Sequence, residues 1–483
     1  MTRFQSLFTI LLAGLALSAT VSPEAVAAVY QLRPDGTGDF PTIQAALADA
    51  SVADGDVIEL TDGTYSGAGN YDIDFLGKQV TVRSQSGNAE ACIIDIGGTP
   101  GEARRGFIFQ NEEGAGAVLE DLRITGAYLE SGSGGGVYID INCTPHLEGC
   151  IFDANSGGHN TGGTALFVGR WADATFHDCR FENNGNSDFD NHVAGAVLLS
   201  DYCEPLFEAC SFVGNIARLG GAVAVNDHGR PAFSACTFAE NEALIGAAVR
   251  AALSSEVELT GCTLADNSAP TASNAVLDSR YGSAINLESC ILAFTVTGCP
   301  AFCNDGTVAF SCSDVYGNDG GDWVGCIAGQ DTMANNLALD PLFCRAEAPT
   351  APYSLRADSP CAADNNPTCG RIGAWPVGCA APGAVAEEPA ALERRLTCIP
   401  NPFRGSLAIE LMRSVDAAEQ AQLVISDVLG RTVCRLPPAT TGSRLRWEWD
   451  GCDAHGMRLP SGCYLCRIAT KSGVATERVL FLP

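Results

Sequence analysis

Six copies of a Cys-x-Phe or Cys-x-Leu triplet decide the fold, and they read Cys150-Ile151-Phe152, Cys179-Arg180-Phe181, Cys210-Ser211-Phe212, Cys236-Thr237-Phe238, Cys262-Thr263-Leu264 and Cys290-Ile291-Leu292. Successive copies begin 29, 31, 26, 26 and 28 residues apart, a spacing typical of a solenoid. The first and third residues of a triplet lie on one face of a β-strand. The middle residue varies from Arg to Ile, as expected of an outward position. We therefore expect the Cys and Phe side chains to point inward and to stack coil upon coil.

An asparagine follows the third triplet position by three residues in five copies, at Asn155, Asn184, Asn215, Asn241 and Asn267. Asparagine tolerates the left-handed backbone conformation and can hydrogen-bond a neighbouring backbone. An asparagine at the same turn of each coil predicts a structural ladder, not a row of catalytic groups.

A second short strand precedes each cysteine. It reads Gly136-Val137-Tyr138-Ile139, Ala165-Leu166-Phe167-Val168, Ala196-Val197-Leu198-Leu199, Ala222-Val223-Ala224-Val225 and Ala248-Val249-Arg250-Ala251. The alternation places Tyr138, Phe167, Leu198, Ala224 and Arg250 on the outside. Short strands with no helix between them predict an all-β protein, a parallel β-helix. The patterns of leucine-rich repeats and propellers are absent.

Both ends of the repeat resemble those of the pectin-lyase-like superfamily of right-handed β-helix proteins. The opening is Gly38-Asp39-Phe40-Pro41-Thr42-Ile43-Gln44-Ala45-Ala46-Leu47, and the closing segments are Asp340-Pro341-Leu342-Phe343, Tyr353-Ser354-Leu355, Ser359-Pro360-Cys361 and Ile372-Gly373-Ala374-Trp375. In the opening, Ile43, Ala46, Leu47 and Ala50 recur at helical spacing, and Pro41 suits a first turn. We expect a helix that caps the β-helix. The resemblance covers residues 29–379 and implies the fold without an activity, because the superfamily mixes lyases, hydrolases, esterases, adhesins and inert surface proteins.

The N-terminus predicts export. Arg3, the apolar run Leu7–Ala19 and the small residues Ala25-Val26-Ala27 are typical of a secretory signal, which we assign to residues 1–28. No later stretch predicts a transmembrane span in the mature chain. The net charge of −29 argues against nucleic acid and anionic membranes as partners. We expect a bacterial protein that is secreted or held at the cell surface.

The C-terminal part has a different pattern. Residues 380–393 are rich in Ala, Pro and Glu and predict a linker. Residues 394–483 carry short strands at Leu407–Leu411, Ala421–Asp427 and Trp447–Trp449, with a further strand from Cys463, which predicts a β-sandwich.

Four motifs of this tail carry a second resemblance. They are Pro400-Asn401-Pro402-Phe403, Asp427-x-x-Gly430-Arg431, Trp449-Asp450-Gly451 and Pro460-Ser461-Gly462-x-Tyr464. The tail resembles the immunoglobulin-like module of flagellar hook-capping proteins and the C-terminal sorting domain of type IX secretion cargo. The resemblance implies contact with secretion or cell-surface machinery. A purely structural terminal module is the alternative.

Three coils carry Trp171, Tyr202 and His228 at one corner, eight residues before a ladder cysteine. With the outward Tyr138 and Phe167 nearby, they form a candidate aromatic platform for the apolar faces of sugar rings. Arg250 could neutralise an acidic sugar. The alternative is that these large side chains shield a turn.

Asp201 and Asp227 precede two of these aromatic residues on adjacent coils. Paired carboxylates can act as acid and nucleophile in glycoside hydrolysis, although solvated turn aspartates are common. The catalytic sets of pectin methylesterases and polygalacturonases are absent. We favour a non-catalytic surface protein that binds polysaccharide on its outer sheet. A polysaccharide lyase or glycoside hydrolase is the competing hypothesis, and a purely structural envelope protein is the third.

No metal site or cofactor is expected, with one open case. The loop from Asn183 to His192 holds Asp188 and Asp190, and such oxygen-rich loops can bind Ca²⁺. It lacks the Gly and the distal Glu of an EF-hand, so a solvated loop is the favoured interpretation.

Export permits disulfides among the 22 cysteines, but the ladder cysteines are interpreted as small core residues instead of zinc ligands. Cys143 and Cys203 lie two coils apart, too far to bridge. Better disulfide candidates are Cys299 with Cys303, and pairs among Cys344, Cys361, Cys369 and Cys379. Cys463 and Cys466 face opposite sides of a predicted strand, which argues against joint chemistry.

Overall fold

The computed structural model describes residues 27–185, 195–270, 274–345, 348, 351–381, 396–399, 403–412, 423–427, 432–437, 444–453, 456–470 and 473–481. The chain divides into two compact units, residues 1–382 and 383–483. The predicted signal sequence, residues 1–28, lies outside the described residues except for its last two. Most of the predicted linker, the 186–194 loop with Asp188 and Asp190, and parts of two tail motifs (residues 400–402 and 428–431) also lie outside them.

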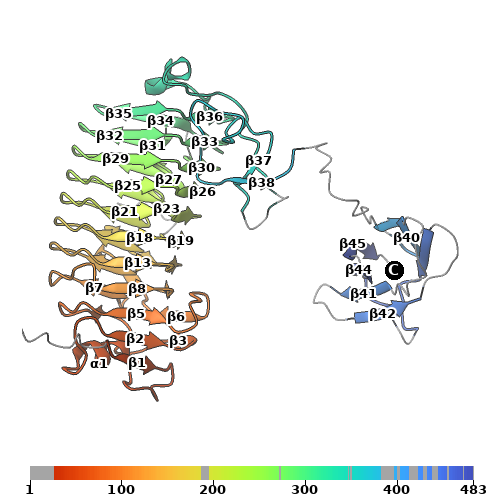
Figure 1. Cartoon of the computed structure of the whole chain (residues 1–483), viewed down its shortest axis with the longest axis horizontal. Coiled ribbons are helices and arrows are strands. Elements are labelled where there is room, and N and C mark those ends of the chain that lie inside the picture. The colour runs from red at the N-terminus through yellow and green to blue at the C-terminus, as the bar shows by residue number, and fades with distance from the viewer. Residues whose placement is uncertain are drawn as a thin grey trace, which may run out of the picture. The chain divides into compact units, whose positions relative to one another are not determined.

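The first unit is a parallel β-helix whose coils follow one another along the axis (Figure 1). Sheet A consists of β1 (Val29–Leu32), β2 (Val57–Leu60), β5 (Thr81–Ser84), β8 (Val118–Glu120), β13 (His146–Glu148), β18 (Thr175–His177), β21 (Leu206–Glu208), β25 (Ala232–Ser234), β29 (Glu256–Thr260), β32 (Ala284–Glu288) and β35 (Thr307–Ser311). Sheet B consists of β3 (Gly63–Tyr65), β6 (Cys92–Asp95), β9 (Arg123–Thr125), β14 (Ile151–Asp153), β19 (Arg180–Glu182), β22 (Ser211–Val213), β26 (Thr237–Ala239), β30 (Thr263–Ala265), β33 (Ile291–Ala293) and β36 (Asp314–Tyr316). Sheet C consists of β4 (Ile73–Asp74), β7 (Phe107–Phe109), β12 (Val137–Ile139), β17 (Leu166–Val168), β20 (Val197–Leu199), β24 (Val223–Val225), β28 (Val249–Ala251), β31 (Ala275–Arg280) and β34 (Cys299–Asn304).

Smaller elements complete this unit. Four parallel pairs join β10 (Tyr128–Leu129) to β15 (Ser156–Gly157), β11 (Gly132–Ser133) to β16 (Thr161–Gly162), β23 (Ile216–Leu219) to β27 (Glu242–Ile245), and β37 (Leu355–Arg356) to β38 (Val377–Cys379). Helix α1 (Ile43–Ala48) lies near the N-terminal end, and two 3₁₀ turns, η1 (Gly325–Ile327) and η2 (Gln330–Thr332), lie after β36.

The predicted inward stacking is confirmed. Each triplet pairs in register with the next, and the six ladder cysteines are at most 1% exposed. Phe152, Phe181, Phe212 and Phe238 stack at centroid distances of 4.6, 4.9 and 4.7 Å. The cysteine thiols donate to backbone carbonyls of the preceding coil, as Cys210 Sγ does to Phe176 O at 3.6 Å. These thiols therefore serve as small core groups with a satisfied donor.

The asparagine ladder is confirmed as well. Asn184 Nδ2 donates to Phe152 O at 2.9 Å and to Asn215 Oδ1 at 3.1 Å, and the Asn184 amide nitrogen donates to the same Oδ1 at 3.0 Å. Each such bond contributes about 1 kcal/mol net. The left-handed conformation belongs to the preceding residue, at Ala154, Asn183, Gly214, Glu240 and Asp266. Asparagine is thus selected for its amide and not for its backbone tolerance.

The predicted cap is helix α1. Thr42 Oγ1 accepts from the Ala45 amide at 3.2 Å and caps the helix, so Pro41 precedes the helix instead of starting it. Ile43, Ala46 and Leu47 are fully buried in the β-helix core, whereas Ala50 is exposed beyond the helix end. No helix in the described part of the chain has the length and apolar character needed to cross a membrane.

Three disulfides staple the C-terminal coils and closing segment: Cys303–Cys326, Cys312–Cys369 and Cys344–Cys379. The expected Cys299–Cys303 pair is wrong, because both residues lie in β34 and four extended residues span about 13 Å. Of the other candidates, Cys344 pairs with Cys379, while Cys361 stays a buried thiol. Cys143 and Cys203 are buried and unbridged, as expected.

The closing segment folds back over the outer face of sheet B from β26 to β36 (Figure 1). Phe343, Tyr353 and Ile372 pack there against outward residues of the sheet such as Ala265. Trp375 Nε1 donates to Thr237 Oγ1 at 2.8 Å. The outer face of sheet B is therefore covered near its C-terminal end.

The second unit contains two antiparallel sheets. One consists of β39 (Leu396–Ile399), β40 (Leu407–Met412) and β43 (Arg444–Trp449), and the other of β42 (Thr432–Leu436), β41 (Leu423–Asp427), β44 (Gly462–Thr470) and β45 (Gly473–Phe481). Residues of both sheets share one core that includes Trp447, Trp449 and Phe481. At Gly451, where φ is +78°, a Cβ would lie 2.5 Å from the Phe481 ring, which explains the glycine of the Trp-Asp-Gly motif.

A buried aspartate makes the closing segment sensitive to pH. Asp314 is fully buried, accepts from the Leu339 amide at 3.1 Å and lies 3.5 Å from Cys361 Sγ. Burial raises the pKa of Asp314 to about 7 from an ordinary 3.8. The folded protein then holds a proton that the unfolded chain has released, so stability falls as pH rises from about 4 to 7 and is level above that.

We expect the free energy of unfolding to fall by about 4 kcal/mol across this window because of Asp314. Asp314→Asn should remove most of that fall, because the amide keeps the shape without ionising. Urea unfolding between pH 4 and 8 measures it, with exposed Asp305→Asn as the control. An unchanged pH slope in Asp314→Asn would contradict the assignment.

Candidate functional site

The corner between sheets C and A carries the aromatic residues singled out in the sequence. Two consecutive residues there have positive φ, as at Asp201-Tyr202, with φ values of 59° and 64°. The Trp171 amide donates to Asp201 O and the Tyr202 amide to Asp227 O, both at 3.0 Å. Backbone bonds between coils thus repeat this unusual corner and bring Trp171, Tyr202 and His228 into one column.

The three rings form a stacked row. The centroids of Trp171 and Tyr202 lie 6.4 Å apart with planes at 28°, and those of Tyr202 and His228 lie 4.5 Å apart at 8°. Trp171 is 61% exposed and Tyr202 is 51% exposed. Because the rings face one another, the row offers ring edges and polar tips along its length, with a face of Trp171 that no ring of the row covers.

Tyr138 and Phe167 stack on each other on the outer face of sheet C, with centroids 5.2 Å apart. Phe167 is only 9% exposed. The Tyr138 hydroxyl donates to Asp140 Oδ2 at 2.7 Å, and the Arg105 guanidinium lies 5.1 Å from its ring centroid. These contacts leave Tyr138 and Phe167 little surface for a ligand, and we exclude them from the candidate site.

The Arg250 side chain already makes one hydrogen bond within the protein. Its Nη1 donates to Asn226 Oδ1 at 2.8 Å, while its buried Nε has no hydrogen-bond partner. Burial lowers the pKa of Arg250. The side chain lies on β28 beside Asp278 of β31, whose carboxylate pairs with Arg280.

Asp201 and Asp227 occupy the same corner position on adjacent coils, directly before Tyr202 and His228. Asp201 is half-buried and Asp227 is exposed. In the coil before them, Arg170 occupies this position, and its Nε lies 3.3 Å from Asp140 Oδ2. The sheet brings the two candidate acids together, but the described residues do not define a catalytic set around them.

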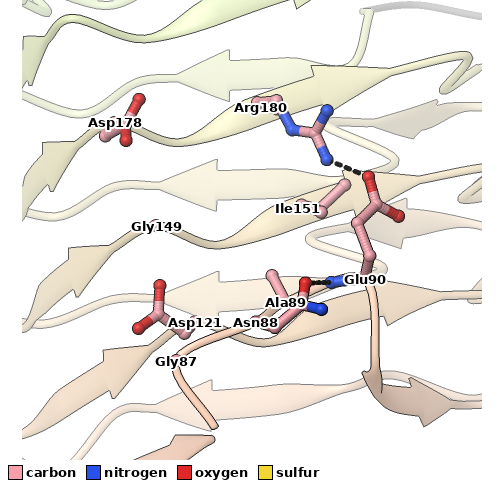
Figure 2. A pocket seen from close by; sticks show the side chains of 9 residues that line it. All are labelled: Gly87, Asn88, Ala89, Glu90, Asp121, Gly149, Ile151, Asp178 and Arg180. Atoms are coloured by element: carbon pink, nitrogen blue, oxygen red, sulfur yellow. Dashed lines mark hydrogen bonds and ion pairs between the residues drawn. The ribbon is translucent and has the colours of Figure 1, made fainter. Parts of the chain in front are cut away.

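A second candidate site lies on the outer face of sheet B. The loop of residues 85–91, between β5 and β6, lies over the sheet and borders an open cavity of about 210 Å³ (Figure 2). Asp121, Gly149 and Asp178 line one side, and Glu90 and Arg180 the other, with Ile151 between them. The closing segment covers the same face farther along the coils.

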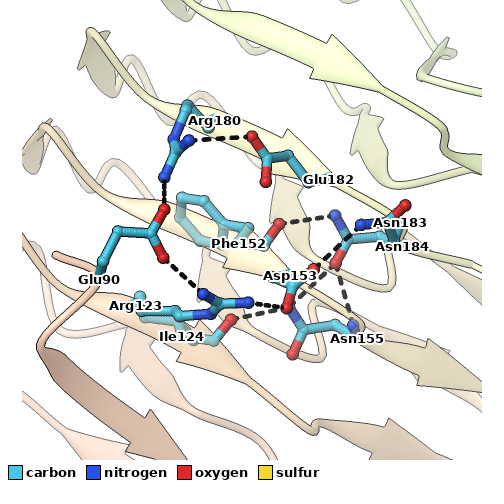
Figure 3. A network of polar contacts seen from close by, with 10 residues as sticks. All are labelled: Glu90, Arg123, Ile124, Phe152, Asp153, Asn155, Arg180, Glu182, Asn183 and Asn184. Atoms are coloured by element: carbon cyan, nitrogen blue, oxygen red, sulfur yellow. Dashed lines mark hydrogen bonds and ion pairs between the residues drawn. The ribbon is translucent and has the colours of Figure 1, made fainter. Parts of the chain in front are cut away.

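Two arginines of sheet B hold the loop through Glu90 (Figure 3). Arg123 Nη1 lies 2.6 Å from Glu90 Oε2, and Arg180 pairs with the other carboxylate oxygen. Arg123 also lies 2.5 Å from Asp153, and Arg180 lies 3.4 Å from Glu182. The hydrogen bond and charge of Arg180, followed by those of Arg123, lower the pKa of Glu90.

Sequence reasoning missed this second site. Arg180 is the middle residue of a triplet, and Arg123 occupies the same position in Leu122-Arg123-Ile124, which has Leu in place of the triplet cysteine. Two arginines at the same outward position of sheet B were the feature of the sequence that could have indicated this site. Glu90 gave none, because its loop has no counterpart in the repeat and lies 90 residues from Arg180.

Among the described residues, no group of three or more His, Cys, Asp or Glu side chains has a geometry that could hold a metal ion. The expected Ca²⁺ loop with Asp188 and Asp190 lies outside those residues. In the second unit, Cys466 is buried in β44.

Comparison with known proteins addresses the fold. Residues 165–338 match the family model described as a right handed beta helix region. No match was found among curated proteins. The solved structure of pectate lyase Pel9A is 13% identical, with a TM-score of 0.44, over 73% of this chain and 98% of that one.

A second solved structure is PorZ, a bacterial surface component of the type-IX secretion system of Porphyromonas gingivalis. It is 20% identical, with a TM-score of 0.15, and the match covers 18% of this chain and only 11% of PorZ. The family match and the observed coils together show that the first unit is a right-handed β-helix.

The Glu90 anchor generates a local prediction. Glu90→Gln should weaken both arginine contacts and speed amide hydrogen exchange in residues 85–91 several-fold, with a global stability change of about 1 kcal/mol or less, as for other exposed ion pairs. Hydrogen exchange followed by mass spectrometry measures this. Glu102→Gln, which removes an exposed pair with Arg104 alone, is the matched control. Unchanged exchange in the loop would show that the anchor does not hold it.

Proposed function

We propose that the protein is an exported, non-catalytic β-helix that binds polysaccharide along the corner between sheets C and A. The observation that carries this proposal is the exposed row of Trp171, Tyr202 and His228. An exposed indole suits the apolar face of a sugar ring, and the polar tips of the row can hydrogen-bond hydroxyl groups.

The exposed rings of the row support a ligand role, although its positive-φ backbone is shared by Ile141-Asn142 and Leu253-Ser254 in other coils. A residue other than glycine in the left-handed region costs about 1–2 kcal/mol, and Trp171 and Tyr202 both adopt it with φ near 60°. Their rings gain little burial in return, since each is more than half exposed. Such strained and exposed positions are where binding groups are commonly found.

Three disulfides support an extracellular location, because such bonds persist in oxidising compartments. The C-terminal sandwich is assigned to export or surface attachment on the resemblance of its motifs to secretion-cargo tails. Contact with secretion or cell-surface machinery would then belong to this unit, and polysaccharide binding to the β-helix.

A polysaccharide array tests the binding function, scoring both retained protein and newly formed reducing or unsaturated ends. We expect binding without product, and an affinity about tenfold weaker in Trp171→Ala and Tyr202→Ala, equivalent to about 1.4 kcal/mol. Val296→Ala is the control, because Val296 is 58% exposed but follows β33, away from this corner.

Other outcomes select the competing functions. Product formation that Asp227→Asn abolishes would make the protein a polysaccharide lyase or glycoside hydrolase, with Asp201 and Asp227 as its acids. Neither binding nor product would leave a structural envelope protein.

Deletion of residues 394–483 tests the role of the tail in the producing bacterium. Because the tail is assigned to export, we expect the shortened protein to be lost from the cell surface and the medium and to be retained inside the cell envelope. Cell fractionation with an antibody against the β-helix measures this. Surface display of the shortened protein would show that export does not require the tail.

A further inference from the structure

The coil before the aromatic row carries an Asn-x-Thr motif, Asn142-Cys143-Thr144. An asparagine followed two positions later by Ser or Thr, with any residue except proline between them, is the acceptor motif of N-linked glycosylation in exported proteins. No other asparagine of the chain satisfies the motif, since Asn366 is followed by proline. Asp140 also supplies, two positions before Asn142, the acidic residue that bacterial transferases of this class recognise. The three disulfides support the export that such a modification requires.

The folded chain exposes the acceptor and buries its neighbours. Asn142 is exposed at the corner between β12 and β13, with φ at 59°. Its backbone amide donates to Arg170 O at 3.0 Å, whereas its side-chain amide has no hydrogen bond with any residue that the structure describes. Asp140 is 3% exposed, and the fully buried Cys143 donates its thiol hydrogen to Glu113 Oε2 at 3.2 Å. The Asn142 side chain can therefore carry a covalent group without disturbing the coil.

Asn142 also has an aromatic neighbour suited to a sugar. It occupies the corner position that Trp171, Tyr202 and His228 occupy in the following coils. Equivalent residues of adjacent coils lie about 4.8 Å apart, so Asn142 is next to Trp171, on the side of the indole away from Tyr202. Aromatic rings suit the apolar faces of sugars. The first sugar on Asn142 Nδ2 would thus lie within reach of an indole that is 61% exposed.

We propose that Asn142 is a site of N-linked glycosylation and that the attached glycan packs against Trp171. The donor is an oligosaccharide linked through a diphosphate to a lipid. Asn142 Nδ2 attacks C1 of its first sugar, so the C1–N bond forms, the C1–O bond breaks, the lipid diphosphate leaves and Nδ2 loses a proton to a base of the transferring enzyme. Because Asp140 and Cys143 are buried in the folded coil, the transfer precedes coil closure. The modification does not depend on the proposed function.

Mass spectrometry of the exported protein, purified from the producing bacterium, tests the modification. Cleavage after glutamate releases residues 131–148, a peptide in which Asn142 is the only asparagine. We expect most of this peptide to be heavier by the mass of one or more sugar residues, and fragmentation to place the sugar on Asn142. An unmodified peptide in the exported protein would overturn the assignment, and so would a sugar on a hydroxyl group of the peptide instead of Asn142.

Variants of the motif separate its chemistry from folding. Asn142→Gln and Thr144→Ala should each abolish the mass increase, whereas Thr144→Ser should keep it, because serine also satisfies the motif. Asn160→Gln is the matched control, since Asn160 is exposed at φ 57° but lacks Ser or Thr two positions later. If Asn142→Gln fails to fold, the Thr144→Ala and Thr144→Ser pair still decides the question. A mass increase that survives in Thr144→Ala would contradict the assignment.

Quenching of tryptophan fluorescence by acrylamide tests the packing of the glycan. Trp171 is exposed, whereas the other four tryptophans of the chain are half-buried or buried. We expect the glycosylated protein to be quenched less than Asn142→Gln from the same bacterium, because the glycan shields the indole. The difference should vanish when both proteins also carry Trp171→Phe. Equal quenching of the glycosylated protein and Asn142→Gln would overturn the packing against Trp171 and leave the modification itself to the mass measurement.

Discussion

Every coil of this protein must return to the same register after a path of variable length, and hydrogen bonding between parallel strands enforces that return. A slip of one residue would turn the inward cysteines and phenylalanines to the outside. The asparagine ladder fixes the register at the sharp turn after sheet B, where the length of the following loop varies between coils. From Asn184 onward, each Asn Oδ1 accepts from both the backbone and the side chain of the preceding asparagine, so a displaced coil would leave buried polar groups without partners.

This constraint also explains how much the sequence could reveal. The triplets and asparagines repeat because stacking demands identical side chains in identical places, so their inward positions could be predicted. The left-handed residue before each asparagine could not be identified as easily, because it varies from Ala154 to Asp266 and only its backbone is shared. Residues on the outer surface need not repeat from coil to coil, so their roles could not be predicted in this way.

The candidate sites differ in the same way. Trp171, Tyr202 and His228 belong to the repeat, and their column could be counted from the ladder cysteines. The cavity depends on a loop that interrupts the repeat and on long-range pairs such as Glu90 with Arg180. Disulfide partners were equally hidden, since Cys312 and Cys369 are 57 residues apart and Cys369 lies in the closing segment, outside the periodic coils.

The thiol ladder has a consequence for the order in which this protein matures. Its six cysteines remain thiols, buried in the core, in a chain that also carries three disulfides. The column continues after Cys290 as Ser313, beside the bridged Cys312, so no ladder thiol neighbours a bridging one at that point. In an oxidising compartment, the ladder thiols are protected from oxidation and wrong disulfide pairing only after the coils have stacked. Rapid stacking of the coils therefore protects these thiols chemically.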